Sequence, residues 1–230
     1  MQMSWSARLY LWACQRLYYE LAWSYDWVSW LVSLGRWGRW RSAACHYLYD
    51  GDGHLSKDVL EIGFGTGELL AQLAQAAADS GGAAVGLELS PAMHREASAK
   101  FRRRHLQALR VRAPAQQMPF DDGSFDAVVS TFPAQYIFDP QTLRECARVL
   151  RSAPLDAEGQ MGGQLLIVGM WVSLHFGWLQ RLGLPFYGQP GPMWMAQVEQ
   201  RLEQAGFDVT FDEVQDGAVT VSVVRGRTRS

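Results

Sequence analysis

Short apolar runs alternate with helix-type patterns through most of the chain. Five of the runs predict strands, and the fourth is nearly continuous, as is typical of a strand buried on both faces of a parallel sheet. They lie at residues 59–62, 83–88, 108–112, 125–130 and 164–169. Between the first two runs, Leu69, Leu70 and Leu73 recur at helical spacing before the breaker Gly81-Gly82. This alternation predicts an α/β fold with a doubly wound sheet.

The C-terminal part of the pattern differs, because two strand-type segments follow each other directly. A helix is expected at 195–205, with strands at 207–214 and 217–224 joined by the turn Gln215-Asp216-Gly217. Such a short joint suits a hairpin. We therefore expect a Rossmann-like, seven-stranded sheet whose last strand is antiparallel.

Two aromatic-rich segments interrupt this scheme. Seven of the ten tryptophans lie within the first 49 residues, where helical spacing predicts helices at 5–23, 26–34 and 38–49. We interpret residues 1–50 as a helical cap over the site, or alternatively as a surface whose aromatic and arginine side chains meet lipid. Residues 171–194 are interpreted as a substrate lid or as a packed surface insertion.

Length and charge narrow the classes of function. A chain of 230 residues with 48% hydrophobic residues suits one domain, formed by a cofactor-binding core at 57–170 and a helix and hairpin at 195–230. A net charge of −2 gives no overall field that attracts nucleic acid. The three cysteines lack metal-site spacing, and we expect no metal. Neither a signal peptide nor a membrane span is predicted, so a cytoplasmic protein is expected, with possible peripheral membrane contact through residues 5–41.

The first apolar run leads into a glycine turn, E-I-G-F-G-T-G, at residues 61–67. Glycines in alternate positions let the backbone approach a ligand, and the next helix points its N-terminal N–H groups at that ligand. A dinucleotide fingerprint requires a small residue where this chain has Glu68, so a nicotinamide-dependent oxidoreductase fits poorly. The carboxylate of Glu61 would repel a pyrophosphate but accept from an ammonium group. The turn therefore predicts a cationic ligand.

A second carboxylate follows at the end of the second predicted strand. Glu88 lies 88 − 67 = 21 residues beyond Gly67, where doubly wound folds place the acid that bonds ribose hydroxyls. Ser90 is expected to cap the next helix, with Pro91 at its first position. The predicted ligand thus carries a ribose as well as a cation.

These motifs resemble those of class I S-adenosylmethionine-dependent methyltransferases. E-I-G-F-G-T-G is similar to the first motif of that family, residues 86–93 to the second, and the P-F…S-F-D pattern at 119–126 to the third. The segment 25–41 more loosely resembles the N-terminal part of the quinone-type C-methyltransferases (methyltransferase type 11).

The resemblance implies S-adenosylmethionine as the cofactor and assigns roles to particular residues. Glu61 would reach the amino group of its methionine part, and Tyr25 would close over that end. Glu88 would bind the ribose, and Met93 would lie near the adenine. The full set expected around the cofactor is Tyr25, Glu61, Gly63, Phe64, Gly65, Gly67, Glu88, Leu89, Met93, Ala115, Gln116 and Thr131.

The chain departs from the family at Ala113-Pro114, where relatives have Gly-Asp. That aspartate accepts from the adenine amino group, and proline has neither an acceptor side chain nor an N–H. Gln116 or Gln117, with the backbone at Ala115, is expected to serve instead. A binding protein that has kept the fold and lost catalysis stays open as an alternative.

The expected reaction is methyl transfer to a small apolar or aromatic acceptor, quinone-like or lipid-like. The sequence T-F-P-A at 131–134 lacks the polar acceptor that amino-methylating enzymes of DNA bases carry, which disfavours a flipped base. Positioning supplies most of the rate enhancement in such a displacement. If the acceptor must lose a proton, His175, Tyr136 and Glu145 are the candidate bases.

Overall fold

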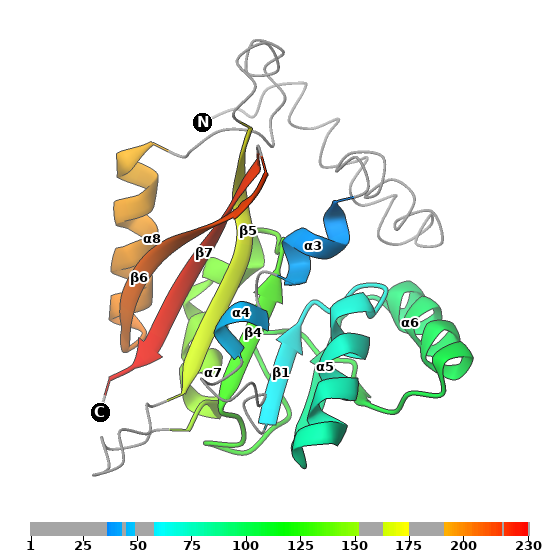
Figure 1. Ribbon diagram of the computed structural model, residues 1–230. Coiled ribbons are helices and arrows are strands. Elements are labelled where there is room, and N and C mark those ends of the chain that lie inside the picture. Colours follow the sequence, from blue (N-terminus) through cyan, green and yellow to red (C-terminus); the bar gives the residue numbers. More distant parts are fainter. Residues whose placement is uncertain are drawn as a thin grey trace.

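The computed structural model describes residues 36–42, 45–48, 58–151, 163–174, 191–217 and 219–229. Seven strands form one sheet in the order β3-β2-β1-β4-β5-β7-β6 (Figure 1). Neighbours from β3 to β5 pair in parallel, and β7 is antiparallel to both β5 and β6. The strands are β1 (Asp58–Ile62), β2 (Ala83–Leu87), β3 (Leu109–Val111), β4 (Ala127–Thr131), β5 (Gln164–Leu174), β6 (Phe207–Asp216) and β7 (Val219–Thr228). The predicted sheet is confirmed.

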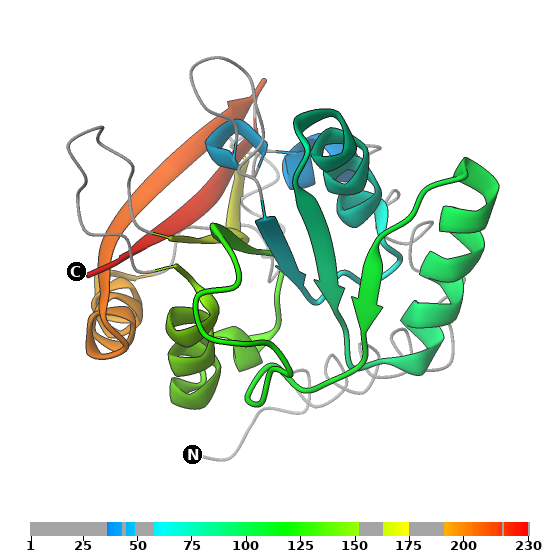
Figure 2. The ribbon, with the colours of Figure 1, turned by 90° about the horizontal axis from the view of Figure 1, so that it is seen from below.

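Helices cover both faces of this sheet (Figure 2). Alternate strand residues explain the two layers, since Val59 packs with Leu73 on one face and Leu60 with Leu143 on the other. The first layer holds α3 (Trp37–Ser42), α4 (Cys45–Leu48) and α5 (Glu68–Ser80). The second holds α7 (Pro140–Val149), α8 (Pro192–Gln204) and the 3₁₀ helix η2 (Gln135–Phe138). Helix α6 (Pro91–Arg104) connects β2 to β3.

Two predicted helix signals are confirmed, the cap at Ser90 and the stop at Gly81. Ser90 accepts from the amide of Met93 at 3.4 Å, and Asp139 accepts from the amide of Gln141 at 2.8 Å. A proline follows each cap at the first helical position. Gly81 ends α5 in a left-handed conformation, with φ 71°.

The predicted lid boundaries are wrong at both ends. Residues 171–174 continue β5, and residues 192–194 already belong to α8. Strand β5 passes through a register shift between Val168 and Val172, where Gly169 has φ 78°. This bulge lets the strand continue past the point where the apolar run ends, and it pairs with β7 as far as Val219. The remainder of the lid, including His175, lies outside the described residues.

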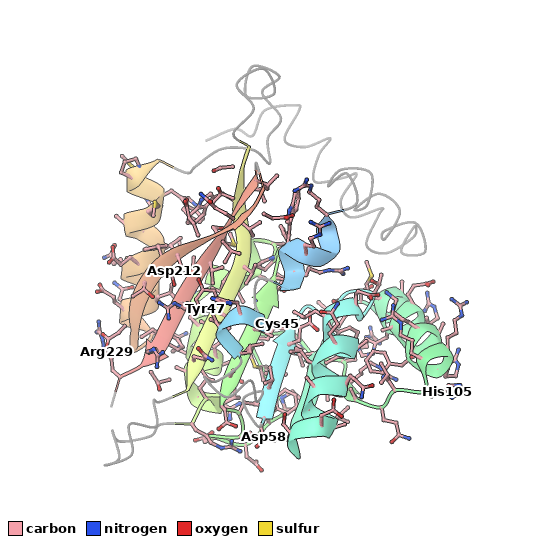
Figure 3. All side chains as sticks on the ribbon, in the orientation of Figure 1. Cys45, Tyr47, Asp58, His105, Asp212 and Arg229 are labelled. Atoms are coloured by element: carbon pink, nitrogen blue, oxygen red, sulfur yellow. The ribbon has the colours of Figure 1, made fainter. Side chains whose placement is uncertain are left out.

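The N-terminal cap is described only in α3 and α4, and the predicted helices at 5–34 lie outside the described residues. The single helix predicted at 38–49 appears as two short helices instead. Helix α4 is held by the side-chain amide of Gln164, whose Nε2 donates to the backbone carbonyl of Tyr47 at 2.9 Å. The guanidinium of Arg225 lies 5.0 Å from the Tyr47 ring centroid. Arg225 also forms an ion pair with Asp212, which is labelled next to Tyr47 in Figure 3. Both helices are thus fixed to the sheet.

Candidate active site

The glycine turn between β1 and α5 has three residues in the left-handed region. Gly63, Gly65 and Gly67 have φ values of 73°, 54° and 77°. A Cβ on Gly63 would lie 2.4 Å from Oη of Tyr136, and one on Gly67 would lie 3.0 Å from Cβ of Ala97. A Cβ on Gly65 would meet nothing within 4 Å. Gly63 and Gly67 are therefore required by protein packing, whereas Gly65 borders the space that a ligand can enter.

Glu68, which the dinucleotide fingerprint does not allow, has a packing role. Its carboxylate pairs with Lys100 at 2.8 Å and with Arg104 at 2.8 Å, both on α6. The same lysine donates to the hydroxyl of Thr66 at 3.3 Å. Hydrogen bonds from Lys100 and Arg104 outweigh burial and lower the pKa of Glu68. The start of α5 is thereby tied to α6 by an anion placed at a helix N-terminus.

The side chain of Phe64 points away from the turn. It is 3% exposed, packs against Gly86 of β2, and meets the ring of His94 edge-on at 4.9 Å. A Cβ on Gly86 would lie 2.5 Å from Cδ1 of this ring. The prediction that the Phe64 side chain contacts the cofactor is therefore wrong, because the ring fills the core. Only the backbone of Phe64 belongs to the turn.

Glu61 lies at the carboxyl end of β1 with a side chain that is 2% exposed. Its Oε2 atom is buried and has no hydrogen-bond partner among the described residues. Burial raises the pKa of Glu61 to about 8, the charge of Arg41 opposes this rise, and the charge of Glu88 adds to it. An acceptor of this kind is costly to leave unpaired, so it fits a cationic ligand group.

Glu88 connects the glycine turn to the loop after β2. Its Oε2 accepts from the amide of Gly65 at 3.1 Å, and its Oε1 accepts from the amide of Ser90 at 2.8 Å. Each carboxylate oxygen keeps a further lone-pair direction. Glu88 is therefore fixed in place and still able to accept from a pair of hydroxyls.

Leu89 and Met93 flank this carboxylate differently. Leu89 is 50% exposed, and its carbonyl accepts from Arg112 at 3.2 Å. Met93 is fully buried. The contacts of both residues with a cofactor stay predictions.

The loop after β3 carries the residues expected at the adenine. The carbonyl of Pro114 accepts from the amide of Gln117 at 3.1 Å, which forms a turn. Ala115 is buried beneath it, and Gln116 is partly exposed beside a cleft. Of the two amides predicted to serve the adenine, Gln116 is the one that lines this cleft.

Glu145 serves this loop rather than the chemistry. It accepts from the amide of Met118 at 2.7 Å and from Nε of Arg148 at 2.7 Å. Arg148 in turn donates to the carbonyls of Phe120 at 2.7 Å and Met118 at 3.0 Å. The hydrogen bond from Arg148 lowers the pKa of Glu145. An ion-paired carboxylate with a lowered pKa is a poor proton acceptor, so Glu145 is corrected from candidate base to loop clamp.

Tyr136 comes from η2 to lie against the glycine turn. Its pKa is raised by burial, while a hydrogen bond with Ser130 opposes the shift. The hydroxyl of Ser130 itself donates to the carbonyl of Ile62 at 2.8 Å, next to the turn. Tyr136 therefore stays protonated at neutral pH, which makes it a hydrogen-bond donor instead of the predicted base.

Phe132, directly after Thr131 at the end of β4, was not predicted as a site residue. It has φ 49°, an uncommon value for a bulky residue, and its amide donates to the carbonyl of Val168 at 2.7 Å. Its ring fills the place where a Cβ of Gly169 would be and lies 6.4 Å from the Trp40 ring. Such strain concentrates at functional sites. The bulge in β5 explains the conformation of Phe132, because Gly169 leaves room for its ring. No local sequence signal predicts this conformation.

An open cleft of about 640 Å³ lies between η2 and the start of α8. Aromatic walls are formed by Tyr136, Phe138 and Trp194, with Gln116 and Arg201 among the polar groups. The Trp194 ring also packs edge-on against Trp171 of β5 at 6.0 Å. Tyr136 thus borders both this cleft and the glycine turn. Of the other predicted site residues, Tyr25 and His175 lie outside the described residues.

Comparison with known proteins decides the family. A model described as "Methyltransferase domain" matches residues 59–153. A demethylmenaquinone methyltransferase of Thermus thermophilus is 32% identical over 180 residues, which cover 75% of each chain. The chain belongs to the class I S-adenosylmethionine-dependent methyltransferases.

A second sequence and a solved structure are also similar to this methyltransferase. A demethylmenaquinone methyltransferase of Tropheryma whipplei is 29% identical over 75% of this chain and 63% of its own length. The crystal structure of an S-adenosylmethionine-dependent methyltransferase from Aquifex aeolicus has the same fold, with a TM-score of 0.55 and 18% identity over 84% of this chain and 93% of that chain.

The residues of this methyltransferase fit its cofactor, S-adenosylmethionine. The unpaired Oε2 of Glu61 suits the ammonium group, the open side of Gly65 admits the ligand, and Glu88 suits the ribose. Within the described ranges, no three His, Cys, Asp or Glu side chains are grouped to hold a metal ion. None of the described helices is both long and apolar enough to cross a membrane.

Proposed function

We propose that this methyltransferase methylates a small, aromatic, quinone-like acceptor bound in the cleft between η2 and α8. The observation that carries the proposal is the buried, unpaired Oε2 of Glu61 at the head of the glycine turn, with Tyr136 between this turn and the cleft. The two demethylmenaquinone methyltransferases among its relatives support a quinone-type acceptor.

When bound, the cofactor would supply a methyl group on a sulfonium. An electron-rich acceptor atom would attack that methyl carbon in line, S-adenosylhomocysteine would leave, and the proton of the attacked atom would pass to solvent. The chain's own contribution is to orient the two reactants. Glu61 holds the ammonium end, and Glu88 holds the ribose while it braces Gly65 through a hydrogen bond of 3.1 Å. Well-oriented reactants can gain about 7–11 kcal/mol over the free reaction.

The walls of the cleft favour a flat, apolar acceptor. The ring of Trp194 is perpendicular to those of Phe138 and Trp171, at centroid distances of 5.8 Å and 6.0 Å. Edge-to-face packing of this kind leaves ring faces for stacking. The phenol of Tyr136, whose pKa is raised by burial, stays protonated where the cleft meets the glycine turn.

We also propose peripheral contact with anionic lipid through residues 5–41, because a quinone with an isoprenoid tail partitions into membranes. The support is the number of tryptophans and arginines in that segment. Arg36 and Arg39 already pair with Asp216, at 3.4 Å and 3.3 Å, so the lipid contact would rest on residues before them. We expect the protein to co-sediment with anionic liposomes at low salt. An absence of co-sedimentation would refute this contact.

The test of the main proposal is transfer of a deuterated methyl group. The purified protein is incubated with methyl-deuterated S-adenosylmethionine and a reduced demethylnaphthoquinone that carries a short isoprenoid chain. We expect a singly labelled quinone by mass spectrometry, with Glu61→Gln as the inactive control. Binding of S-adenosylhomocysteine without turnover on any quinol would favour the inactive binding protein. Binding of NADH in its place would favour the oxidoreductase.

A further inference from the structure

Helix α3 places an arginine beside the buried carboxyl group of Glu61. The helix packs against both α5 and β5, above the carboxyl ends of β1 and β4 (Figure 1). Trp40 is 3% exposed and packs near Phe132. Arg36 donates to the carbonyl of Asp216 at 2.9 Å and, with Arg39, pairs with its carboxylate. Arg36 thereby attaches the start of the helix to Asp216, and the buried Trp40 anchors the residue next to Arg41.

Arg41 lies near enough to Glu61 for its charge to act on the carboxyl group, although no hydrogen bond between the two side chains is found. The charge of Arg41 lowers the pKa of Glu61 against the larger effect of burial. Nevertheless, Nε of Arg41 and Oε2 of Glu61 are both buried without a hydrogen-bond partner among the described residues. No ion pair within 4.0 Å joins these two residues. A buried donor on Arg41 and a buried acceptor on Glu61 are thus both left without a partner among the described residues.

An unpaired buried donor and an unpaired buried acceptor each cost free energy, which a bound ligand would recover. The ligand that fits must present an anion to Arg41 and a cation to Glu61 within a short distance. An α-amino acid group has this arrangement, since its ammonium and carboxylate share one carbon atom. Arginine is well suited to the carboxylate because it can donate in a fork.

We propose that Arg41 binds the α-carboxylate of the cofactor's methionine part while Glu61 binds its ammonium group. This inference rests on the proposed function, because it assigns a ligand contact within the same site. Arg41 is then a binding residue supplied by the N-terminal cap, and α3 is needed for cofactor affinity. The competing explanation is that Arg41 only offsets the charge of Glu61.

Two ligands distinguish these explanations. S-adenosylhomocysteine carries both the ammonium and the carboxylate, whereas decarboxylated S-adenosylmethionine keeps the ammonium and lacks the carboxylate. We expect Arg41→Gln to weaken S-adenosylhomocysteine binding by about 10- to 100-fold in calorimetry, the range for hydrogen bonds to charged groups. Binding of the decarboxylated ligand should weaken by clearly less, because it loses only the effect of the Arg41 charge on Glu61. Arg41→Lys, which keeps the charge without the fork, should give an intermediate loss.

Arg39→Gln is the matched control, because Arg39 lies on the same helix and its partner Asp216 also pairs with Arg36. It should leave both affinities unchanged, and thermal unfolding should confirm that each variant is folded. Equal weakening of both ligands by Arg41→Gln would overturn the inference in favour of an action through Glu61. An unchanged affinity for S-adenosylhomocysteine would overturn it too. If the wild type binds neither ligand, the proposed function itself fails, which is a distinct result.

Discussion

The hydroxyl of Tyr136 occupies the space in which Gly63 would carry a Cβ, at 2.4 Å from that position. Gly63 also has φ 73°. A side chain at this position would therefore meet two obstacles, one in the backbone and one in the packing. The contact joins η2 to the glycine turn, so the acceptor side and the cofactor side of the site share one boundary.

Gly63→Ala is expected to destabilise the fold and to abolish cofactor binding. The left-handed backbone alone costs about 1–2 kcal/mol for a residue with a Cβ, before the clash with Tyr136 is counted. Gly65→Ala is the matched comparison, because its φ is 54° and its Cβ would meet open space. Urea unfolding should show a larger loss for Gly63→Ala, while calorimetry should show lost binding for both. Equal unfolding energies would contradict the assigned contact.

Cofactor affinity is expected to depend on pH through Glu61. Its pKa of about 8 means that the ligand-free site is mostly neutral at pH 7, although the ammonium group requires the carboxylate. Affinity for S-adenosylhomocysteine should therefore rise by up to about tenfold per pH unit below the pKa and level off near it. Calorimetry in buffers of different ionisation enthalpy should detect proton release on binding. A pH-independent affinity in the wild type would contradict this account.

The stability of the ligand-free protein should fall as pH rises, which is opposite to the trend in affinity. Because the folded pKa of Glu61 is raised from 4.5 to about 8, its favourable contribution is complete below the lower value and is lost as pH rises to the upper one. The loss approaches about 1.4 kcal/mol per pH unit in that window. Glu61→Gln should remove this slope and be the more stable protein at pH 8. A variant that is less stable than the wild type at this pH would oppose the prediction.

The variant Glu145→Gln distinguishes two roles of Glu145, holding the loop at 113–118 and acting as a general base. Since the carboxylate already accepts from Met118 and Arg148, we expect kcat to stay within about tenfold of the wild type. KM for the cofactor should rise modestly as the loop at 113–118 loosens. Loss of a general base would instead lower kcat by about 10²–10⁴-fold with little effect on KM. Steady-state kinetics with both substrates varied would distinguish these outcomes.

Local signals predicted much of the architecture. The apolar runs identified the parallel strands, and the cap at Ser90 followed from its residue type and the proline after it. The spacing from Gly67 placed Glu88 at the end of β2, where it accepts from Gly65. These features depend on short stretches of sequence, so pattern and turn chemistry suffice for them.

The missed features depend on contacts between distant segments. Phe64 was expected to face the cofactor, but Gly86 of the next strand leaves room for its ring in the core. The strained Phe132 needs the glycine bulge at Gly169, 37 residues later in the chain (169 − 132 = 37). The closeness of Arg41 to Glu61 arises only when α3 packs over the sheet edge. None of these pairings leaves a periodic signal in one sequence.

Glu61 is proposed to mark the site for the amino acid end of S-adenosylmethionine. The most direct measurement is calorimetric titration of S-adenosylhomocysteine into the wild type and Glu61→Gln at pH 8, where the wild-type carboxylate is available. We predict binding to one site per wild-type chain and an affinity at least about tenfold weaker in the variant. Equal affinity in the two proteins, or no binding to the wild type, would contradict the claim.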